Sequence, residues 1–190
     1  MKGRFIVAAL AALVALGVAG FALADDFVGT RGNDTLVGTT SDDRIAALAG
    51  DDNVDAKAGN DHVFAGPGND IVDAGPGNDR VRGGAGNDTI NGGEGDDLLR
   101  GRRGDDTVSG GPGNDRVFVG PGADTEFGGS GNDRMHAVFP DNQVDTIDCG
   151  AGYDIVFLNR NEHDLTDDCE VIRYVTPRAS ANESADTDDR

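Results

Sequence analysis

The sequence is poor in basic residues, in cysteine and in the short motifs that mark enzymes. Lys and Arg total 16 against 35 Asp and Glu, so the formal net charge is −19 and nucleic acid is not expected as a partner. There is no His-Glu-x-x-His motif, no Gly-x-Ser-x-Gly turn and no phosphate-binding loop of the Walker type. The histidines His62, His136 and His163 lie far apart in the chain. We therefore predict that the protein is not an enzyme and has no catalytic residues.

What the sequence does contain is a nine-residue period. The period runs from Gly29 to His136 as twelve copies without insertion or deletion, and the fourth position is glycine except at Ser41. The eighth position is apolar except at Glu126. A fixed period of this length predicts a solenoid of stacked coils. The sixth position is always aspartate: Asp34, Asp43, Asp52, Asp61, Asp70, Asp79, Asp88, Asp97, Asp106, Asp115, Asp124 and Asp133.

Apolar side chains are too few to hold such a solenoid together alone. Each repeat offers about one large apolar residue, and its burial cannot offset the conformational entropy that nine backbone residues lose on folding. Aspartates that recur in every repeat also repel one another once the coils are stacked. The sequence therefore predicts that a bound cation completes the fold.

The loops carry the ligands that a hard cation prefers. Loops such as Gly66-Pro67-Gly68-Asn69-Asp70 combine a carboxylate with backbone carbonyls, and neither Cys nor His recurs with the period. This donor set favours calcium over zinc or copper, and we expect several calcium ions. Glycine at the second and fourth positions permits the positive φ that lets the backbone approach an ion. The loops with both glycines include the pairs Gly66 and Gly68, Gly75 and Gly77, Gly84 and Gly86, Gly93 and Gly95, and Gly111 and Gly113.

These repeats resemble the nonapeptide repeats of hemolysin-type (RTX) calcium-binding proteins, Gly-Gly-x-Gly-x-Asp-x-apolar-x. Residues 83–91 match that pattern at every specified position. The resemblance implies an all-β fold, a right-handed parallel β-roll in which two repeats form one coil. It also implies that calcium lies between the loops of successive coils. The implied ligands are loop carbonyls at the glycines named above and the carboxylates of Asp34, Asp52, Asp61, Asp70, Asp79, Asp88, Asp97, Asp106, Asp115, Asp124 and Asp133.

The repeats differ in how well they match, and affinity should differ with them. The second position is Thr39, Leu48 or Lys57 in three early copies, and Arg102 occupies it later. We therefore predict tight binding in residues 65–100 and 110–135 and weak or absent binding in residues 38–64. Asp43 should matter least.

Two repeats in each coil would place alternate repeats on two different faces. The seventh positions then form one column rich in threonine and one that is basic. The threonine column allows calcium-dependent ice binding as an alternative function, although Asn53 and Ile71 interrupt it. The basic column either neutralises neighbouring aspartates and limits aggregation or binds polyanions or glycans. With the ninth positions it comprises Arg44, Arg80, Arg82, Arg100, Arg116 and Arg134.

The N-terminal segment has the layout of a secretory signal peptide. Lys2 and Arg4 precede an apolar stretch that ends in Ala22-Leu23-Ala24, so we expect cleavage after Ala24. An uncleaved membrane anchor is the alternative, because the stretch is long enough to span a bilayer. After cleavage we expect no membrane span and a secreted protein, extracellular or at the cell surface, where calcium is plentiful. There it would act as a structural or binding module.

Four segments therefore make up the chain. Residues 1–24 are the signal segment, 25–136 the β-roll, 137–176 further repeats with a cap, and 177–190 a polar tail expected to be disordered. Cys149 and Cys169 are the two cysteines, and in an exported protein they most simply form one disulfide. That bond would close the cap over the open end of the solenoid.

Overall fold

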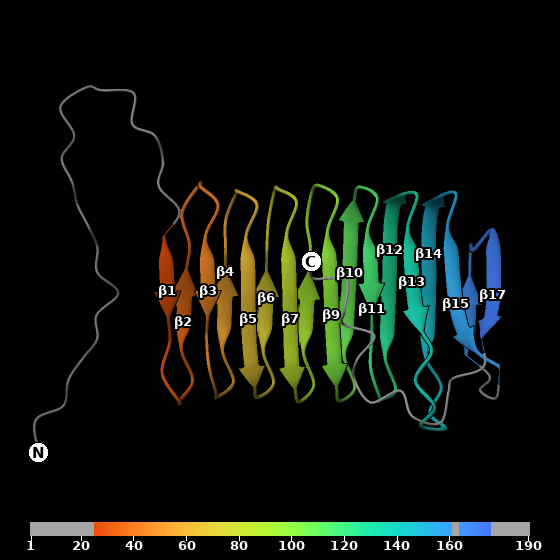
Figure 1. Cartoon of the computed structure of the whole chain (residues 1–190), viewed down its shortest axis with the longest axis horizontal. Helices are drawn as coiled ribbons and strands as arrows, with labels where there is room; N and C mark the ends of the chain where they lie inside the picture. The colour runs from red at the N-terminus through yellow and green to blue at the C-terminus, as the bar shows by residue number, and fades with distance from the viewer. Residues whose placement is uncertain (1–24, 161–163, 176–190) are drawn as a thin grey trace, which may run out of the picture.

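The computed structural model describes residues 25–160 and 164–175, and within them the protein is all β-structure. The signal segment and the polar tail lie outside these residues. No helix in the described part of the chain is long and apolar enough to cross a membrane. The strands form two parallel sheets that face each other along the roll (Figure 1).

The two sheets take alternate strands of the chain. The nine-stranded sheet consists of β1 (Asp26–Val28), β3 (Arg44–Ala46), β5 (His62–Pro67), β7 (Arg80–Ala85), β9 (Leu98–Arg103), β11 (Arg116–Phe118), β13 (Arg134–Ala137), β15 (Ile155–Asn159) and β17 (Val171–Val175). The eight-stranded sheet consists of β2 (Thr35–Val37), β4 (Asn53–Asp55), β6 (Ile71–Asp73), β8 (Thr89–Asn91), β10 (Thr107–Pro112), β12 (Thr125–Gly131), β14 (Thr146–Gly152) and β16 (Leu165–Asp167).

Each coil of the roll contains two repeats. Arg44 pairs with His62 in one sheet and Thr35 pairs with Asn53 in the other, so every residue lies beside the residue two repeats further along. The same register continues through the twelve copies, and all of these pairs are parallel. The structure thus confirms the predicted parallel β-roll and the assignment of alternate repeats to two faces.

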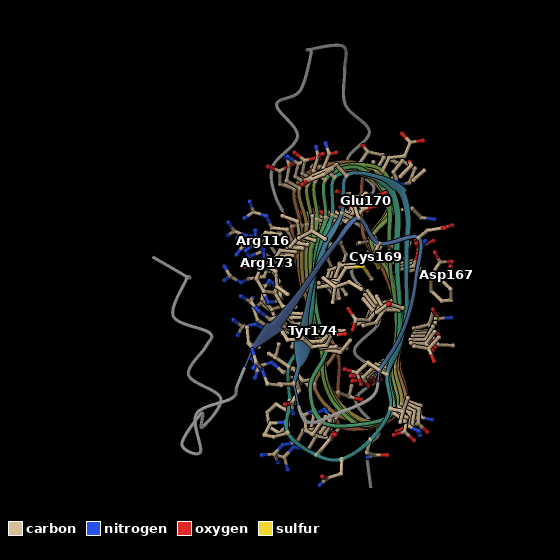
Figure 2. The ribbon with its side chains drawn as sticks, turned by 90° about the vertical axis from the view of Figure 1, so that its right-hand side faces the viewer. Arg116, Asp167, Cys169, Glu170, Arg173 and Tyr174 are labelled. Carbon is tan, nitrogen blue, oxygen red and sulfur yellow. A yellow bond between two sulfur atoms is a disulfide. The ribbon has the colours of Figure 1, made fainter. Side chains whose placement is uncertain are left out.

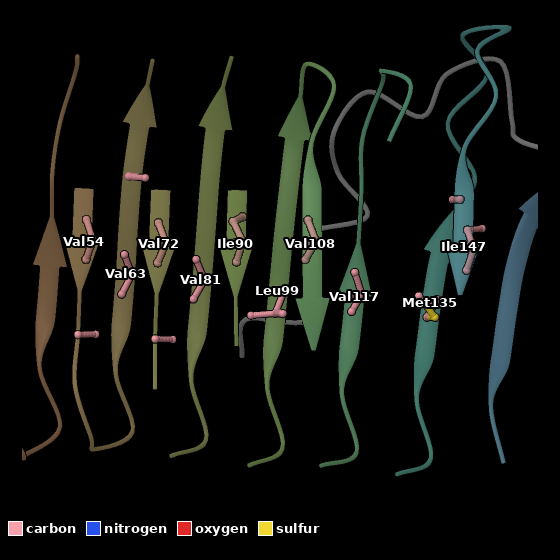
Figure 3. Packing of buried hydrophobic residues seen from close by; sticks show 14 of the residues in the cluster. Val54, Val63, Val72, Val81, Ile90, Leu99, Val108, Val117, Met135 and Ile147 are labelled. Carbon is pink, nitrogen blue, oxygen red and sulfur yellow. The ribbon is translucent and has the colours of Figure 1, made fainter. Parts of the chain in front are cut away.

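The core between the two sheets consists mainly of eighth-position side chains, with small first-position residues such as Ala65 and Ala74 beside them. Successive residues of a strand point to opposite faces, so the eighth residue turns inward while the seventh and ninth turn outward. Val63, Val81 and Leu99 come from one sheet and meet Val54, Val72 and Ile90 from the other (Figure 3). All of these side chains are buried. The layer is continuous but thin, as the repeat composition requires.

The turns depend on backbone conformations that favour glycine. Gly84 has a φ of +138°, and a Cβ at that position would lie 1.9 Å from the carbonyl oxygen of Gly66 in the preceding coil. Leu48, Lys57 and Arg102 hold positive φ values of 86°, 85° and 91° at the equivalent position. The loop geometry therefore persists where glycine is absent, at the energetic cost that a side chain pays in this region.

Past His136 the roll continues through an insertion. The backbone N–H of Asp124 donates to Asp145 across 21 residues, whereas the equivalent bonds in the regular repeats span 18. Strands β14 to β17 extend both sheets, so the predicted cap is itself built from further coils. The predicted disulfide between Cys149 and Cys169 is present and ties β14 to the segment between β16 and β17.

Glu126 is a carboxylic acid at an otherwise apolar core position. It occupies the eighth position of its repeat, in β12, and lies between Val108 and Ile147 of the neighbouring strands. It is fully buried, and neither carboxyl oxygen has a hydrogen-bond partner. Burial raises the pKa of Glu126 well above its usual range, and the charges of Asp145 and Asp124 raise it further. A buried polar group without a partner is destabilising. The structure accommodates Glu126 but gains nothing from it.

We predict that Glu126→Val stabilises the roll. Valine would extend the apolar column and remove the unpartnered carboxyl, so the free energy of unfolding should rise by about 1–3 kcal/mol. The measurement is denaturant unfolding at saturating calcium. Glu126→Gln is the matched control, because it removes the charge but leaves polar atoms in the core, and its gain should be smaller. A Glu126→Val protein less stable than the parent would contradict this account.

Candidate metal centre

The sixth-position aspartates form two ladders, one along each turn region of the roll. Each aspartate ends a loop and precedes a strand, and from Asp43 onward its Oδ1 accepts a hydrogen bond from the backbone N–H of the aspartate one coil earlier. The N–H of Asp70 donates to Asp88 Oδ1 at 2.9 Å, and the N–H of Asp88 donates to Asp106 Oδ1 at 2.9 Å. On the other turn, Asp79 donates in the same way to Asp97 at 2.8 Å. One carboxylate oxygen of each rung is thus committed to holding neighbouring coils together.

The second oxygen of these carboxylates is buried and has no partner. This holds for Oδ2 of Asp52, Asp61, Asp70, Asp79, Asp88, Asp97, Asp106, Asp115, Asp124, Asp133 and Asp154. Buried polar atoms are nearly always paired in native proteins, and a whole row of unpaired carboxylate oxygens is far outside that pattern. A row of bound cations would supply the missing partners. The donor set of carboxylate and carbonyl oxygens fits calcium.

Burial and mutual repulsion raise the pKa values of these aspartates. Loss of solvent is the largest cause, and the charges of neighbouring aspartates add to it, while the hydrogen bond from the preceding coil acts in the opposite direction. The pKa is raised to about 6 for Asp133. It is raised to about 7 for Asp79, Asp88, Asp97, Asp106, Asp115, Asp124 and Asp145. Without a cation, ionising this ladder at neutral pH opposes folding.

Carboxylates alone do not form the site. The described residues contain no group of three or more His, Cys, Asp or Glu side chains placed to hold one metal ion. Each ion would therefore need backbone oxygens from the loops in addition to aspartate. The glycines predicted as carbonyl donors are in the loops next to the ladder, and Gly66, Gly68, Gly84 and Gly86 all have positive φ. The same conformation occurs at Gly75, Gly77, Gly93, Gly95, Gly111 and Gly113.

Two aspartates differ from the rest because threonine already satisfies them. Oδ2 of Asp43 accepts the N–H of Thr39 at 2.6 Å and also lies 3.1 Å from its hydroxyl oxygen. Oδ2 of Asp34 accepts the N–H of Thr30 at 2.6 Å and its hydroxyl at 2.9 Å. Asp34 was predicted as a ligand and Asp43 as the weakest position, yet in the structure a threonine N–H and hydroxyl occupy Oδ2 of both. Asp52 carries an unpartnered oxygen like the later repeats, and weak binding in its block stays a prediction.

Several positions that support the ladder were not among the predicted site residues. A Cβ at the first-position Gly83 would lie 2.2 Å from Asp88 Oδ2, so glycine there leaves room beside the carboxylate. The equivalent position is alanine at Ala65 and Ala74. Asp145 and Asp154 continue the ladders beyond the insertion. The change from alanine to glycine at the first position, and the Asp of the two later copies, were the signals available in the sequence.

The exposed fifth positions form a further hydrogen-bond ladder, in which donor and acceptor coils are reversed relative to the sixth-position ladders. The N–H of Asn69 donates to Asp51 Oδ1 at 2.9 Å, and the N–H of Asn87 donates to Asn69 Oδ1 at 2.8 Å. Here the side chain belongs to the earlier coil, whereas in the sixth-position ladder it belongs to the later one. The two ladders together bond each loop to the next without using Asp Oδ2. Bonds from backbone N–H groups to side-chain Oδ1 atoms therefore set the spacing of the loops, and the unpartnered Oδ2 atoms stay available to ions.

We predict that Asp88→Asn weakens calcium binding and that Asp43→Asn does not. Asparagine keeps the Oδ1 acceptor that holds Asp70, so only the charge and the unpartnered oxygen change. The calcium concentration that gives half of the calcium-induced β signal should rise severalfold for Asp88→Asn, because affinity follows the number of charged ligands. Asp43→Asn is the matched control, since Thr39 already occupies its oxygen. Equal shifts for the two variants would contradict the difference between them.

The raised pKa values predict opposite pH dependences with and without calcium. Aspartates such as Asp79 and Asp88, with folded pKa values of about 7, lie above the unfolded value of about 3.9. The calcium-free roll is then most stable in acid and loses that stability as pH rises through about 7. Calcium competes with these protons, so its affinity should rise over the same interval.

Thermal unfolding in chelator at about pH 5 and about pH 8 tests this dependence. The melting temperature should be higher in acid, and calcium added near neutral pH should release protons that an indicator dye can report. Ionisation of Asp79 and Asp88 is the source of both effects. A calcium-free protein that becomes more stable between those two pH values would show that the aspartates are not protonated in the folded state.

The repeat region matches the model of a known protein family. The model of the RTX calcium-binding nonapeptide repeat (4 copies) matches residues 28–63, 47–81, 64–99, 73–108, 91–126 and 109–137. A comparison with curated proteins gives no match. The matched segments run without a gap from residue 28 to residue 137 and so include both aspartate ladders. The chain belongs to the family of RTX calcium-binding nonapeptide-repeat proteins.

Proposed function

We propose that the protein is a secreted module whose β-roll folds when it binds calcium. The observation that carries this proposal is the row of buried Asp Oδ2 atoms without partners, which extends from Asp52 to Asp133. The family supplies the identity of the ion. Calcium would neutralise the ladder and bind its free oxygens. The chain contributes Asp Oδ2 and loop carbonyls as ligands, while Asp Oδ1 keeps successive coils in register.

The thin core explains why calcium binding would drive folding, instead of following it in a protein that is already folded. The apolar layer holds one large side chain per repeat, such as Val72 or Ile90, together with small first-position residues such as Ala74. This layer must offset both chain entropy and the repulsion between stacked aspartates. Where the calcium-free core is inadequate, the free energy of ion binding becomes free energy of folding.

An extracellular role is supported by the disulfide and by the supply of calcium. The bond between Cys149 and Cys169 is of the kind that persists in oxidising compartments. Sites that are individually weak fill where calcium is abundant, as it is outside cells. The signal-like segment before Asp25 agrees with export. We propose that the folded roll serves there as a structural or binding module and not as an enzyme.

Ice binding is the less favoured alternative. Thr89, Thr107, Thr125 and Thr146 lie next to one another in the eight-stranded sheet, which extends the threonine column by one strand beyond the regular repeats. Asn53 and Ile71 nevertheless interrupt the column. The neighbouring ninth positions carry Asp55, Asp73 and Phe127, so the sheet does not present the uniform array that ice recognition would use.

Far-UV circular dichroism during a calcium titration tests calcium-dependent folding. The β signal should rise cooperatively with calcium and vanish when chelator is added, while magnesium at the same concentrations should have little effect. Magnesium is the control because it demands a stricter octahedral geometry and keeps its own waters. If the β signal is already complete in chelator at neutral pH, the aspartate ladder is not required for folding and the proposal fails.

A further inference from the structure

One of the two sixth-position ladders begins at the backbone nitrogen of Asp25, the first residue that the structure describes. That nitrogen donates to Oδ1 of Asp43 at 3.1 Å. The same bond repeats from coil to coil, beginning with the bond from Asp43 to Asp61 at 2.7 Å. The ladder ends where Asp154 donates to Glu170, which is labelled in Figure 2 at the C-terminal end of the roll. Asp25 therefore supplies the first donor of a ladder that runs the length of the roll.

The acceptor of this first bond is a buried carboxylate that lacks a counter-charge. Asp43 is only 3% exposed. The N–H and hydroxyl of Thr39 occupy its Oδ2, the oxygen that stays unpartnered for a cation in later coils. Within residues 25–160 and 164–175, no basic side chain forms an ion pair with Asp43. A buried charge is costly unless an opposite charge compensates it. Asp43 thus has its hydrogen bonds but not the charge that would balance it.

Other aspartates of the ladders have a solution that Asp43 does not share. Asp34 begins the ladder on the opposite turn, and Thr30 occupies its Oδ2 in the same way. Asp34 is only half-buried, so water can solvate its charge. Asp61, the next rung after Asp43, keeps an unpartnered Oδ2 that a cation can bind. Asp43 has neither the water nor the free oxygen.

We propose that cleavage after Ala24 turns the nitrogen of Asp25 into the counter-ion of Asp43. Hydrolysis by a signal peptidase breaks the peptide bond between these residues and consumes one water molecule. The oxygen of that water goes to the carboxylate left on Ala24, and its two protons go to the nitrogen of Asp25. An α-amino group is mostly protonated at neutral pH, so an ammonium replaces a neutral N–H donor at the same place. A charge-assisted hydrogen bond of this kind is roughly twice as strong as a neutral one.

Contacts of the first strand fix the position of this nitrogen. The carbonyl of Asp25 accepts the N–H of Arg44 at 2.9 Å. Strand β1 then pairs in register with β3, so that Phe27 lies beside Ile45. A chain that begins before Asp25 keeps an uncharged N–H at this point, and a chain that begins after it has no donor there. The ion pair with Asp43 therefore requires a chain that starts at Asp25. This inference rests on the proposed function, because it requires export and removal of the preceding segment.

Amide hydrogen exchange in saturating calcium tests the ion pair on two forms of the protein. One form begins at Asp25, and the other carries Gly-Ser-Gly before Asp25, which keeps the N–H donor but moves the charge along the chain. The amide of Arg44 should exchange roughly tenfold faster in the extended form, since a charge-assisted bond is replaced by a neutral one and the first strand opens more often. The amide of Thr107, in a distant coil, should exchange equally in both forms. Equal exchange at Arg44 would overturn the proposal.

Two substitutions show whether the charge of Asp43 is responsible. Asp43→Asn keeps the Oδ1 acceptor and removes the charge, so its two forms should exchange alike at Arg44. Asp26→Asn is the matched control, because it removes the same charge from an exposed neighbour of Asp25 on β1. The difference between the two forms should persist in this control. A difference that survives Asp43→Asn, or that disappears in Asp26→Asn, would assign the effect to something other than this ion pair.

Two further measurements separate this inference from the proposed function. Mass spectrometry of the protein exported from cells that express the full chain identifies its first residue, and a first residue other than Asp25 would rule out the ion pair. Circular dichroism in the same calcium buffer shows whether each form is folded. A roll that folds with calcium but shows no difference at Arg44 refutes the ion pair and leaves calcium-dependent folding intact.

Discussion

The fold depends on a carboxylate that divides its two oxygens between two tasks. In each repeat, Oδ1 of the aspartate accepts the backbone N–H of the coil before it, as Asp88 does from Asp70. This bond fixes the spacing of the coils and buries the side chain. Burial in turn leaves Oδ2 without water or a protein partner. The same geometry that makes the roll regular therefore makes it incomplete without a cation.

This arrangement links folding to the surroundings of the protein. In the proposed function, a ladder of aspartates whose pKa values are raised to about 7 would respond both to calcium and to protons, whereas a core made only of apolar side chains would respond to neither. The thin apolar layer agrees with the proposed dependence on calcium, because a larger core would fold without the ion. Threonine at Thr30 and Thr39 shows the alternative within this chain, since a hydroxyl and an N–H there satisfy the aspartate without metal. We therefore expect the first coils to be the part least dependent on calcium.

Most of this fold could be predicted from the sequence because the period is strict, so that the structure of one coil determines that of the next. Aspartate at the sixth position of each repeat predicts the ladder, and the apolar eighth position predicts the core. The coil of two repeats follows from the family resemblance. The division of labour between Oδ1 and Oδ2 was not predictable, because it depends on the direction in which each N–H points toward the next coil. The three-residue slip of the register after His136 is visible in the sequence, and the 21-residue spacing of Asp124 and Asp145 confirms it, but the contact that closes the inserted loop is not. There Asp141 accepts the N–H of Gly122 at 2.6 Å, in place of the carbonyl that does so in regular coils.

A solenoid that must bind cations at its turns can still present cations on its face. The turns are crowded with aspartate, so outward strand positions are where charge of either sign can vary without disturbing the ladder. In this chain the nine-stranded sheet uses that freedom for arginine, and the eight-stranded sheet for threonine, asparagine and aspartate. In-register arginines on neighbouring strands work against stability, and neither the core nor the ladder requires them. The two sheets can therefore carry different charge on their outer surfaces while the ladder and the core stay the same.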